Sequence, residues 1–146
     1  MQVNVPRLVL AGTNSGCGKT TVTCAVLQAL VNRGMAVGAA KCGPDYIDPM
    51  FHSRIIGTRS RNLDAFLCGR DTVPALLQRS AGRDISVIEG VMGYYDGLAG
   101  TSSENSTADI ARLTQSPTVL VVSAKGMSLT LAALLRGFLQ FEQNTI

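Results

Sequence analysis

A glycine-rich loop constrains this chain more than any other feature of its sequence. The loop spans residues 12–20 and lies between the apolar run 7–11, which predicts a buried strand, and a helical pattern that begins at Gly18. A strand, a glycine-rich turn and a helix in this order gather backbone N–H groups and a helix N-terminus around one point. Such a unit predicts an α/β domain whose loop binds an anion.

Each residue type in the loop suits phosphate binding. Glycines let the backbone curl around an anion, Lys19 supplies a full positive charge, and Thr20 can place its hydroxyl on Mg²⁺. The usual pattern is G-x-x-x-x-G-K-[ST], whereas here Gly12 comes one residue early and Thr13 occupies the first glycine position. An ordinary glycine-rich turn is the alternative, and the Gly-Lys-Thr ending favours nucleotide binding. The predicted nucleotide-binding residues are Thr13, Asn14, Ser15, Gly16, Cys17, Gly18, Lys19, Thr20 and Thr21.

Apolar runs and helical patterns alternate along the rest of the chain. Apolar runs at 36–40, 85–88 and 118–122 predict three further strands, and helices are predicted after Gly18, from Asp71 and over 131–139. Strands that are apolar throughout are typical of a parallel sheet covered on both faces. We therefore predict a three-layer P-loop NTPase fold with a mostly parallel sheet. The stretch 41–62 is too long for a simple connection, so we expect it to be functional or partly helical.

Composition excludes several classes of protein. With 146 residues and 46% hydrophobic positions the chain can form one core, and its net charge of +3 is too small for a dedicated nucleic-acid binder. No apolar run is long enough to span a bilayer and no signal peptide is recognisable, so no membrane partner is expected. Four cysteines without a C-x-x-C pair, beside one histidine, predict reduced thiols and a cytoplasmic location rather than a zinc site.

Charged side chains follow the second and third predicted strands. Lys41 ends the second strand, Asp45 follows it, and Glu89 ends the third strand. The carboxyl ends of parallel strands share one crevice, so these groups are expected to face the nucleotide. Mg²⁺ prefers oxygen ligands, and we expect Thr20, Asp45 and Glu89 around it. Lys19 and Lys41 would neutralise charge on a transferring phosphoryl group, although a solvated strand end is the alternative for Lys41. The candidate catalytic residues are Lys19, Lys41, Asp45 and Glu89.

Other polar residues carry weaker signals. His52 has no paired nucleophile or metal partner, which favours a structural or substrate-contact role over general-base chemistry. Residues 106–109 have the S-x-x-D form of a helix cap, and Cys17 is interpreted as a spectator within the loop. A group of arginines is either a dock for an acidic substrate or a solvated surface. These arginines are Arg54, Arg59, Arg61 and Arg70.

Five segments, in order along the chain, carry a resemblance to a known family. They are GTNSGCGKTT at 12–21, KCGPDYIDP at 41–49, NLD at 62–64, EGVMGYYDG at 89–97 and STAD at 106–109. The chain resembles the N-terminal half of the cobyrinic acid a,c-diamide synthases, and its loop variant is similar to that of dethiobiotin synthetase. The resemblance implies ATP- and glutamine-dependent amidation of the a and c side-chain carboxylates of cobyrinic acid through an acyl phosphate, with Mg²⁺ as cofactor.

The resemblance also implies an incomplete enzyme. Members of the family carry a C-terminal glutaminase domain, normally on the same chain, with a nucleophilic cysteine and a histidine that nothing in this chain matches. Residues 1–146 are therefore expected to be an unfinished ATP-binding synthetase domain that cannot use glutamine by itself, and a homodimer is compatible with the family. The partner that the resemblance implies is cobyrinic acid or a related polycarboxylate tetrapyrrole. Tyr46, Asp48 and Asp96 are implied on the ring-facing side of the site.

Three alternatives stay open. The enzyme that amidates nickel sirohydrochlorin shares much of the same pattern. A nucleotide-switch ATPase of the ParA or MinD type would be a binding protein rather than a ligase, and it carries a second lysine where this chain has Asn14. Dethiobiotin synthetase has a related loop, but the segment 41–49 argues against it.

Overall fold

The strands form one sheet in which the strand that leads into the phosphate loop lies between two others. The computed structural model describes residues 5–80, 82–142 and 145–146. The strands are β1 (Arg7–Gly12), β2 (Val37–Cys42), β3 (Arg61–Leu63), β4 (Ile85–Glu89) and β5 (Thr118–Val121), in the sheet order β3-β2-β4-β1-β5. Every pairing between them is parallel. The predicted α/β fold is confirmed, and the sheet is parallel throughout the described part of the chain.

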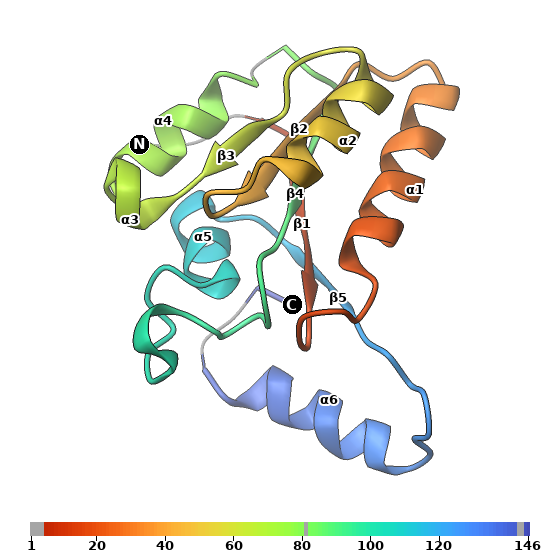
Figure 1. Ribbon diagram of the computed structural model, residues 1–146, viewed down its shortest axis with the longest axis vertical. Coiled ribbons are helices and arrows are strands. Elements are labelled where there is room, and N and C mark those ends of the chain that lie inside the picture. The colour runs from red at the N-terminus through yellow and green to blue at the C-terminus, as the bar shows by residue number, and fades with distance from the viewer. Residues whose placement is uncertain (1–4, 81, 143–144) are drawn as a thin grey trace.

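Helices cover both faces of this sheet and give three layers (Figure 1). The helices are α1 (Lys19–Asn32), α2 (Ile47–Ile56), α3 (Ala65–Cys68), α4 (Thr72–Gln78), α5 (Thr107–Thr114) and α6 (Thr130–Gln140), with a short 3₁₀ turn η1 (Leu98–Gly100). Helices α1 and α2 pack together on one face, and α4 and α5 pack together on the other.

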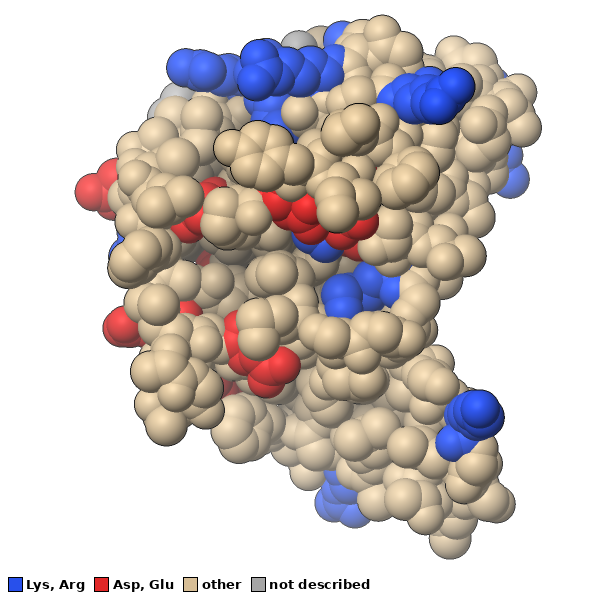
Figure 2. Space-filling model, viewed as in Figure 1, with Lys and Arg blue, Asp and Glu red and all other residues tan. Residues whose placement is uncertain are grey.

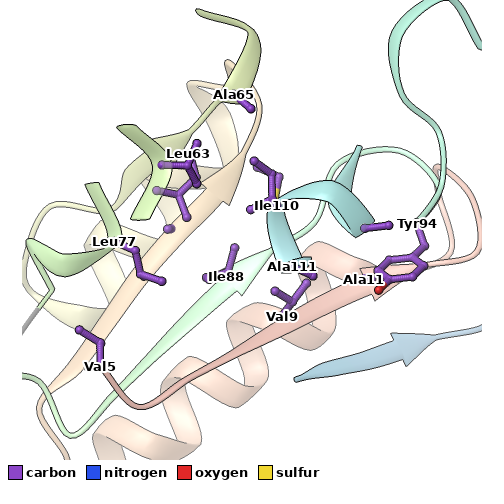
Figure 3. Close-up of a cluster of buried hydrophobic side chains, with 14 residues drawn as sticks. Val5, Val9, Ala11, Leu63, Ala65, Leu77, Ile88, Tyr94, Ile110 and Ala111 are labelled. Atoms are coloured by element: carbon purple, nitrogen blue, oxygen red, sulfur yellow. The ribbon is translucent and has the colours of Figure 1, made fainter. Parts of the chain in front are cut away.

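Alternate residues of the central strands supply the two cores. In β1, Val9 and Ala11 belong to the core beneath α4 and α5, whereas Leu10 belongs to the core beneath α1. In β4, Ile88 belongs to the core beneath α4 and α5, and Val87 belongs to the core beneath α1. Figure 3 shows the first of these cores, between the sheet and α5. Because side chains alternate between faces, a strand covered on both sides must be apolar at successive positions, as the sequence indicated.

The stretch 41–62 contains more regular structure than its sequence indicated. It holds α2 and leads into β3, a strand at the edge of the sheet that the sequence did not predict. Of the three residues of β3 only Leu63 is fully buried, so the strand has no apolar run to reveal it. Strand β2 continues past the predicted run 36–40 through Lys41, because the partner strands satisfy its polar end.

Helix α6 differs from α1 and α5 because none of its residues is buried. The helix predicted over 131–139 is confirmed, but it lies beside the rest of the domain rather than on the sheet (Figure 1). The chain then returns to the sheet, where the Thr118 N–H donates to the carbonyl of Thr145 at 2.8 Å. Within the described residues, no helix combines the length and the apolar character that a membrane span requires.

Candidate nucleotide-binding and metal-binding site

The phosphate loop connects the end of β1 to the start of α1. Gly18 adopts a left-handed backbone conformation with φ 98°, and α1 begins at the next residue, Lys19. The Lys19 Nζ donates to the carbonyl oxygens of Asn14, at 2.9 Å, and of Met92, at 2.7 Å. A Cβ at Gly12 would lie 2.8 Å from the Lys19 Cδ, so the side chain can fold back over the loop only because residue 12 is glycine. The early glycine in the pattern therefore has a steric cause.

The remaining predicted nucleotide-binding residues line the open side of the loop. Asn14, Ser15 and Gly16 are exposed, and Thr21 is exposed on the first turn of α1. Thr13, Cys17 and Gly18 are half-buried, and the Thr13 hydroxyl donates to the Asn14 Oδ1 at 2.9 Å. The loop is thus open to an incoming anion beside the helix N-terminus, which favours negative charge.

Beside this loop lies a group of polar side chains that we call the ionic cluster. It consists of Thr20, Lys41, Asp45, Asp48 and Glu89. The Thr20 hydroxyl donates to Glu89 Oε1 at 2.6 Å and lies 3.3 Å from Asp48 Oδ1. The Lys41 Nζ lies 2.6 Å from Asp48 Oδ2 and 3.2 Å from Glu89 Oε1, and it also donates to the Gly90 carbonyl at 2.9 Å.

Strand register explains why the ionic cluster forms. Lys41 and Glu89 are direct partners across the parallel pair β2 and β4, so both reach the carboxyl edge of the sheet together. Figure 2 shows acidic and basic side chains meeting at a hollow in the middle of this face. The predicted convergence of Lys41 and Glu89 on the loop is therefore visible in the structure, as the shared crevice of parallel strands requires.

Asp45 and Asp48 lie at positions that differ from those expected from the sequence. The Asp45 Oδ1 accepts the Ile47 N–H at 2.9 Å at the start of α2, and its Oδ2 lies 3.9 Å from the Lys41 Nζ. Asp48, expected on the ring-facing side, lies within 3.3 Å of the Thr20 hydroxyl and closer to the Lys41 Nζ than Asp45 does. The sequence and its family resemblance assign Asp45 to the metal and Asp48 to the ring-facing side, whereas α2 turns Asp48 toward Thr20 and Lys41.

The ionic cluster fits a cation shared with a nucleotide. Three carboxylates (Asp45, Asp48 and Glu89) surround the single ammonium of Lys41, which leaves excess negative charge. Among the described residues no group of three or more His, Cys, Asp and Glu forms a metal cage. Mg²⁺ needs no such cage, since it commonly takes one or two carboxylates and completes its shell with water and phosphates. Thr20 and the carboxylates are therefore suitable ligands for a nucleotide-bound Mg²⁺.

A buried histidine holds the other oxygen of Glu89. His52 is fully buried, and its Nε2 donates to Glu89 Oε2 at 2.7 Å, while Nδ1 lies 3.3 Å from the Ser60 hydroxyl. An ionised carboxylate only accepts hydrogen bonds, so Nε2 carries the proton. The structure therefore gives His52 a positioning role, which agrees with the structural role that the sequence favoured over general-base chemistry. Its spacing of four residues from Asp48 places both on one face of α2, a signal that could have predicted this contact.

These contacts hold the charges of the ionic cluster in place. Burial alone would raise the pKa of Glu89, but hydrogen bonds from His52 and Thr20 and the charge of Lys41 outweigh it and lower the pKa. Burial would lower the pKa of Lys41, and here the hydrogen bond to Asp48 and the charge of Glu89 raise it instead. Neighbouring Cys42 is an inert thiol, because burial raises its pKa to about 12.

The loop after β4 packs directly against the phosphate loop. The Tyr94 N–H donates to the Gly12 carbonyl at 2.8 Å, and a Cβ at Gly93 would lie 2.9 Å from the Thr13 carbonyl oxygen. Asp96 is exposed, and its Oδ2 accepts the Gly93 N–H at 2.9 Å. Asp96 therefore shapes the turn that packs against the phosphate loop, and its role toward a ligand stays a prediction.

Residues 106–109 form the predicted helix cap and also clamp this loop. The Ser106 hydroxyl accepts the Asp109 N–H at 3.3 Å, and the Thr107 hydroxyl contacts both the N–H and the carbonyl of Val91. Asp109 forms an ion pair with Arg70. Arg70 thus serves the fold, and only the other arginines of its group are left to meet a ligand.

Comparisons with known proteins identify the family of this chain. Residues 8–145 match the family model described as "CobQ/CobB/MinD/ParA nucleotide binding domain". Over 139 residues the chain is 51% identical to the hydrogenobyrinate a,c-diamide synthase of Streptomyces coelicolor, covering 94% of this chain and 29% of that protein. It is 50% identical over 140 residues to the cobyrinate a,c-diamide synthase of Thermoplasma volcanium, covering 95% and 31%. It is 48% identical over 137 residues to the cobyrinate a,c-diamide synthase of Clostridium acetobutylicum, and the match covers 94% of this chain and 31% of that protein. The chain therefore spans a little under a third of the length of these curated relatives.

Proposed function

The chain belongs to the CobQ/CobB/MinD/ParA nucleotide binding domain family, and from this premise we propose that it is the ATP- and acceptor-binding part of an a,c-diamide synthase for cobyrinate or hydrogenobyrinate. The observation that carries the proposal is the ionic cluster, in which Lys41, Asp48 and Glu89 adjoin a phosphate loop. The names of the relatives reported above support a cobyrinate-type acceptor over nickel sirohydrochlorin.

The proposed reaction has two steps. An oxygen of an acceptor carboxylate attacks the γ-phosphorus of ATP, the bond from that phosphorus to the bridging oxygen breaks, and ADP leaves with the electron pair. The acceptor becomes an acyl phosphate. The lone pair of ammonia then attacks the acyl carbon, inorganic phosphate departs, and loss of a proton from nitrogen leaves the amide.

The residues of the site have separate parts in this reaction. Lys19 lies in the loop and would move from its carbonyl partners to the nucleotide phosphates, whereas Lys41 would stabilise charge on the transferring phosphoryl group. Thr20, Asp45 and Glu89, with Asp48 beside them, would hold Mg²⁺, which supplies neutralisation of phosphate charge when bound. Tyr46 and Asp96 are assigned to the acceptor side of the site.

Ammonia is assigned to a separate glutaminase portion of the same protein. A glutaminase of this kind needs a free histidine next to a nucleophilic cysteine. The one histidine of this chain is engaged with Glu89 and Ser60. We place the reaction in the cytoplasm, a location that the four free cysteines support.

The test uses free ammonia, so that amide formation does not depend on glutamine. The protein is incubated with MgATP, ammonium chloride and either cobyrinic acid or nickel sirohydrochlorin, and the products are weighed by mass spectrometry. The proposal predicts ADP formation that depends on cobyrinic acid, with a ring in which OH is replaced by NH₂ at up to two carboxyls. Binding of MgATP with no change in ADP formation on adding either ring would contradict it.

A further inference from the structure

Helix α2 carries its polar and apolar residues on unexpected sides. Asp48 and His52 face inward, onto the ionic cluster and Glu89. Ile47, Met50 and Phe51 are 67%, 71% and 55% exposed. The later residues Ile55 and Ile56 pack against the core beneath α1, as the apolar side of a surface helix normally does. The exposed apolar residues therefore form a second apolar surface, which nothing in the described structure covers.

The exposed apolar residues of α2 form one continuous surface. Ile47, Met50, Phe51 and Arg54 follow the spacing i, i+3, i+4 and i+7, which places them on one side of the helix. Tyr46, 85% exposed, immediately precedes them. We call these five residues the α2 face.

The α2 face begins at the ionic cluster and ends at a free positive charge. Its first residues directly follow Asp45, and the same helical turn presents Asp48 to Lys41. Seven residues of helix place Arg54 about 10 Å further along. Arg54 is exposed and forms no hydrogen bond or ion pair within the described residues. An apolar strip therefore runs from the reacting groups to an unpaired guanidinium.

We infer that the α2 face binds the acceptor of the reaction: an apolar macrocycle that lies on Ile47, Met50 and Phe51 and pairs a peripheral carboxylate with Arg54. This inference rests on the proposed function. The chemistry of the α2 face matches a planar ring with carboxylates at its edge, since aliphatic and aromatic side chains meet the ring and a guanidinium meets the acid. The flexible Met50 can adapt to an irregular ring surface.

The extent and position of the α2 face favour a ring over a second copy of the chain. A stable interface between proteins buries about 800 Å² on each partner, and one side of the ten-residue helix α2 offers far less. A ring on this face has its edge beside Asp48 and Lys41, where a second carboxylate could meet the nucleotide. Ring binding thus explains both the inward acid and the outward apolar residues of one helix.

The experiment titrates the protein with hydrogenobyrinic acid in the absence of nucleotide and follows the absorbance of the ring. Phe51→Ser and Met50→Ser should each raise the dissociation constant about tenfold, which corresponds to the loss of a partly buried apolar side chain. Arg54→Gln should weaken binding about fivefold. It should also abolish any preference for the acid over a methyl-esterified ring, because the ester offers no carboxylate to Arg54.

Matched controls lie on other exposed parts of the molecule. Leu129→Ser changes an apolar residue that is 83% exposed before α6, and Arg33→Gln changes an exposed arginine at the end of α1. Both should leave ring binding unchanged. MgATP affinity should be the same in every variant, since no substituted residue belongs to the phosphate loop or to the ionic cluster.

The outcomes separate the inference from the proposed function. Ring binding that is unchanged in Phe51→Ser, Met50→Ser and Arg54→Gln would overturn the inference and leave the proposed function standing. No ring binding by the unsubstituted protein, together with normal MgATP binding, would overturn both. If the variants instead reduce self-association in sedimentation while ring binding is unchanged, the α2 face is a contact between copies of this chain and the inference fails.

Discussion

The ionic cluster buries charged side chains, whereas helix α6 leaves apolar side chains at least partly exposed. In the ionic cluster, Lys41 and Glu89 are charged and almost completely removed from water, and each has several partners. In α6 the side chains are mainly apolar, yet none is buried. Polar groups in the first region are held by register and reciprocal bonds, whereas the second region is held by a few contacts at its surface.

Helix α6 is attached mainly through aromatic side chains. Tyr95 stacks on Phe138 with ring centroids 5.7 Å apart, lies 5.1 Å from the Phe141 ring, and its hydroxyl donates to the Phe138 carbonyl at 2.7 Å. An apolar cavity of about 450 Å³ remains beside these rings. It is lined by Tyr95, Ala133, Leu134, Gly137, Phe138 and Phe141. The contrast predicts that substitutions in the ionic cluster act on the whole domain and those at α6 act locally.

The largest effect is expected for Glu89→Ala. This change removes the fully buried carboxylate, so Lys41 keeps only Asp48 and the more distant Asp45, and His52 loses its acceptor. Breaking a buried ion pair typically costs about 3–5 kcal/mol. Urea denaturation should show that loss in the free energy of unfolding, and Mg²⁺-dependent nucleotide binding should disappear. A loss below about 1 kcal/mol, the range of surface pairs, would mean that the ionic cluster stabilises the domain no more than exposed charges do.

A smaller and more specific effect is expected at His52. His52→Gln can place an amide N–H near the Nε2 position and keep the bond to Glu89, whereas the shorter side chain in His52→Asn reaches only toward Ser60. The Asn variant should lose about 1–3 kcal/mol of unfolding free energy, because Glu89 Oε2 lacks its donor. It should also require more Mg²⁺ for nucleotide binding. Equal losses in both variants would mean that His52 acts only by filling space.

The pH dependence of stability should follow the charges of the ionic cluster. Because the pKa of Glu89 is lowered in the folded state, its ionised carboxylate stabilises the fold at pH values above the ordinary pKa of glutamate. This stability is lost as the pH falls below about 4. The raised pKa of Lys41 gives stability that is present at lower pH and is lost only in strongly alkaline solution. Thermal melting should therefore show a plateau between these limits. Glu89→Gln should flatten the acid side of the profile, and an unchanged acid side would contradict the assignment.

The smallest effect is expected for Tyr95→Phe. The change keeps the aromatic packing and removes one hydrogen bond to Phe138, which is worth about 0.5–1.5 kcal/mol. Hydrogen exchange should become faster in α6 and stay unchanged in β1 and β4. Faster exchange throughout the sheet would mean that α6 is coupled to the domain as tightly as the ionic cluster is.

Local signals were enough to predict the first half of the site. The apolar run, the glycines and Gly-Lys-Thr all agree over residues 7–20, so the strand, loop and helix could be predicted together. Lys41 and Glu89 could be placed in one crevice because the carboxyl ends of parallel strands must meet there.

Contacts between residues far apart in the sequence determine which side of each helix is buried, and these contacts could not be predicted from the sequence. The polar residues of α2 could not be assigned to its inner side from the sequence, because their partners come from other elements: Thr20 and Lys41 contact the half-buried Asp48, and Glu89 contacts the buried His52. In the same way, α1 buries Thr23 and Leu27 while the apolar Val22 is exposed. Periodicity predicts that a helix forms, whereas the surrounding elements decide which side of it is buried.

Trapping the acyl phosphate is the most direct test that this chain transfers a phosphoryl group from ATP to a carboxylate of the ring. The protein is incubated with MgATP, cobyrinic acid and hydroxylamine in place of ammonia, and ring hydroxamate and ADP are measured together. We predict hydroxamate and ADP in equal amounts, dependent on the ring and abolished by Lys41→Met, which removes the ammonium proposed to stabilise the transferring phosphoryl group. ADP formed without hydroxamate, or at the same rate without the ring, would contradict this prediction.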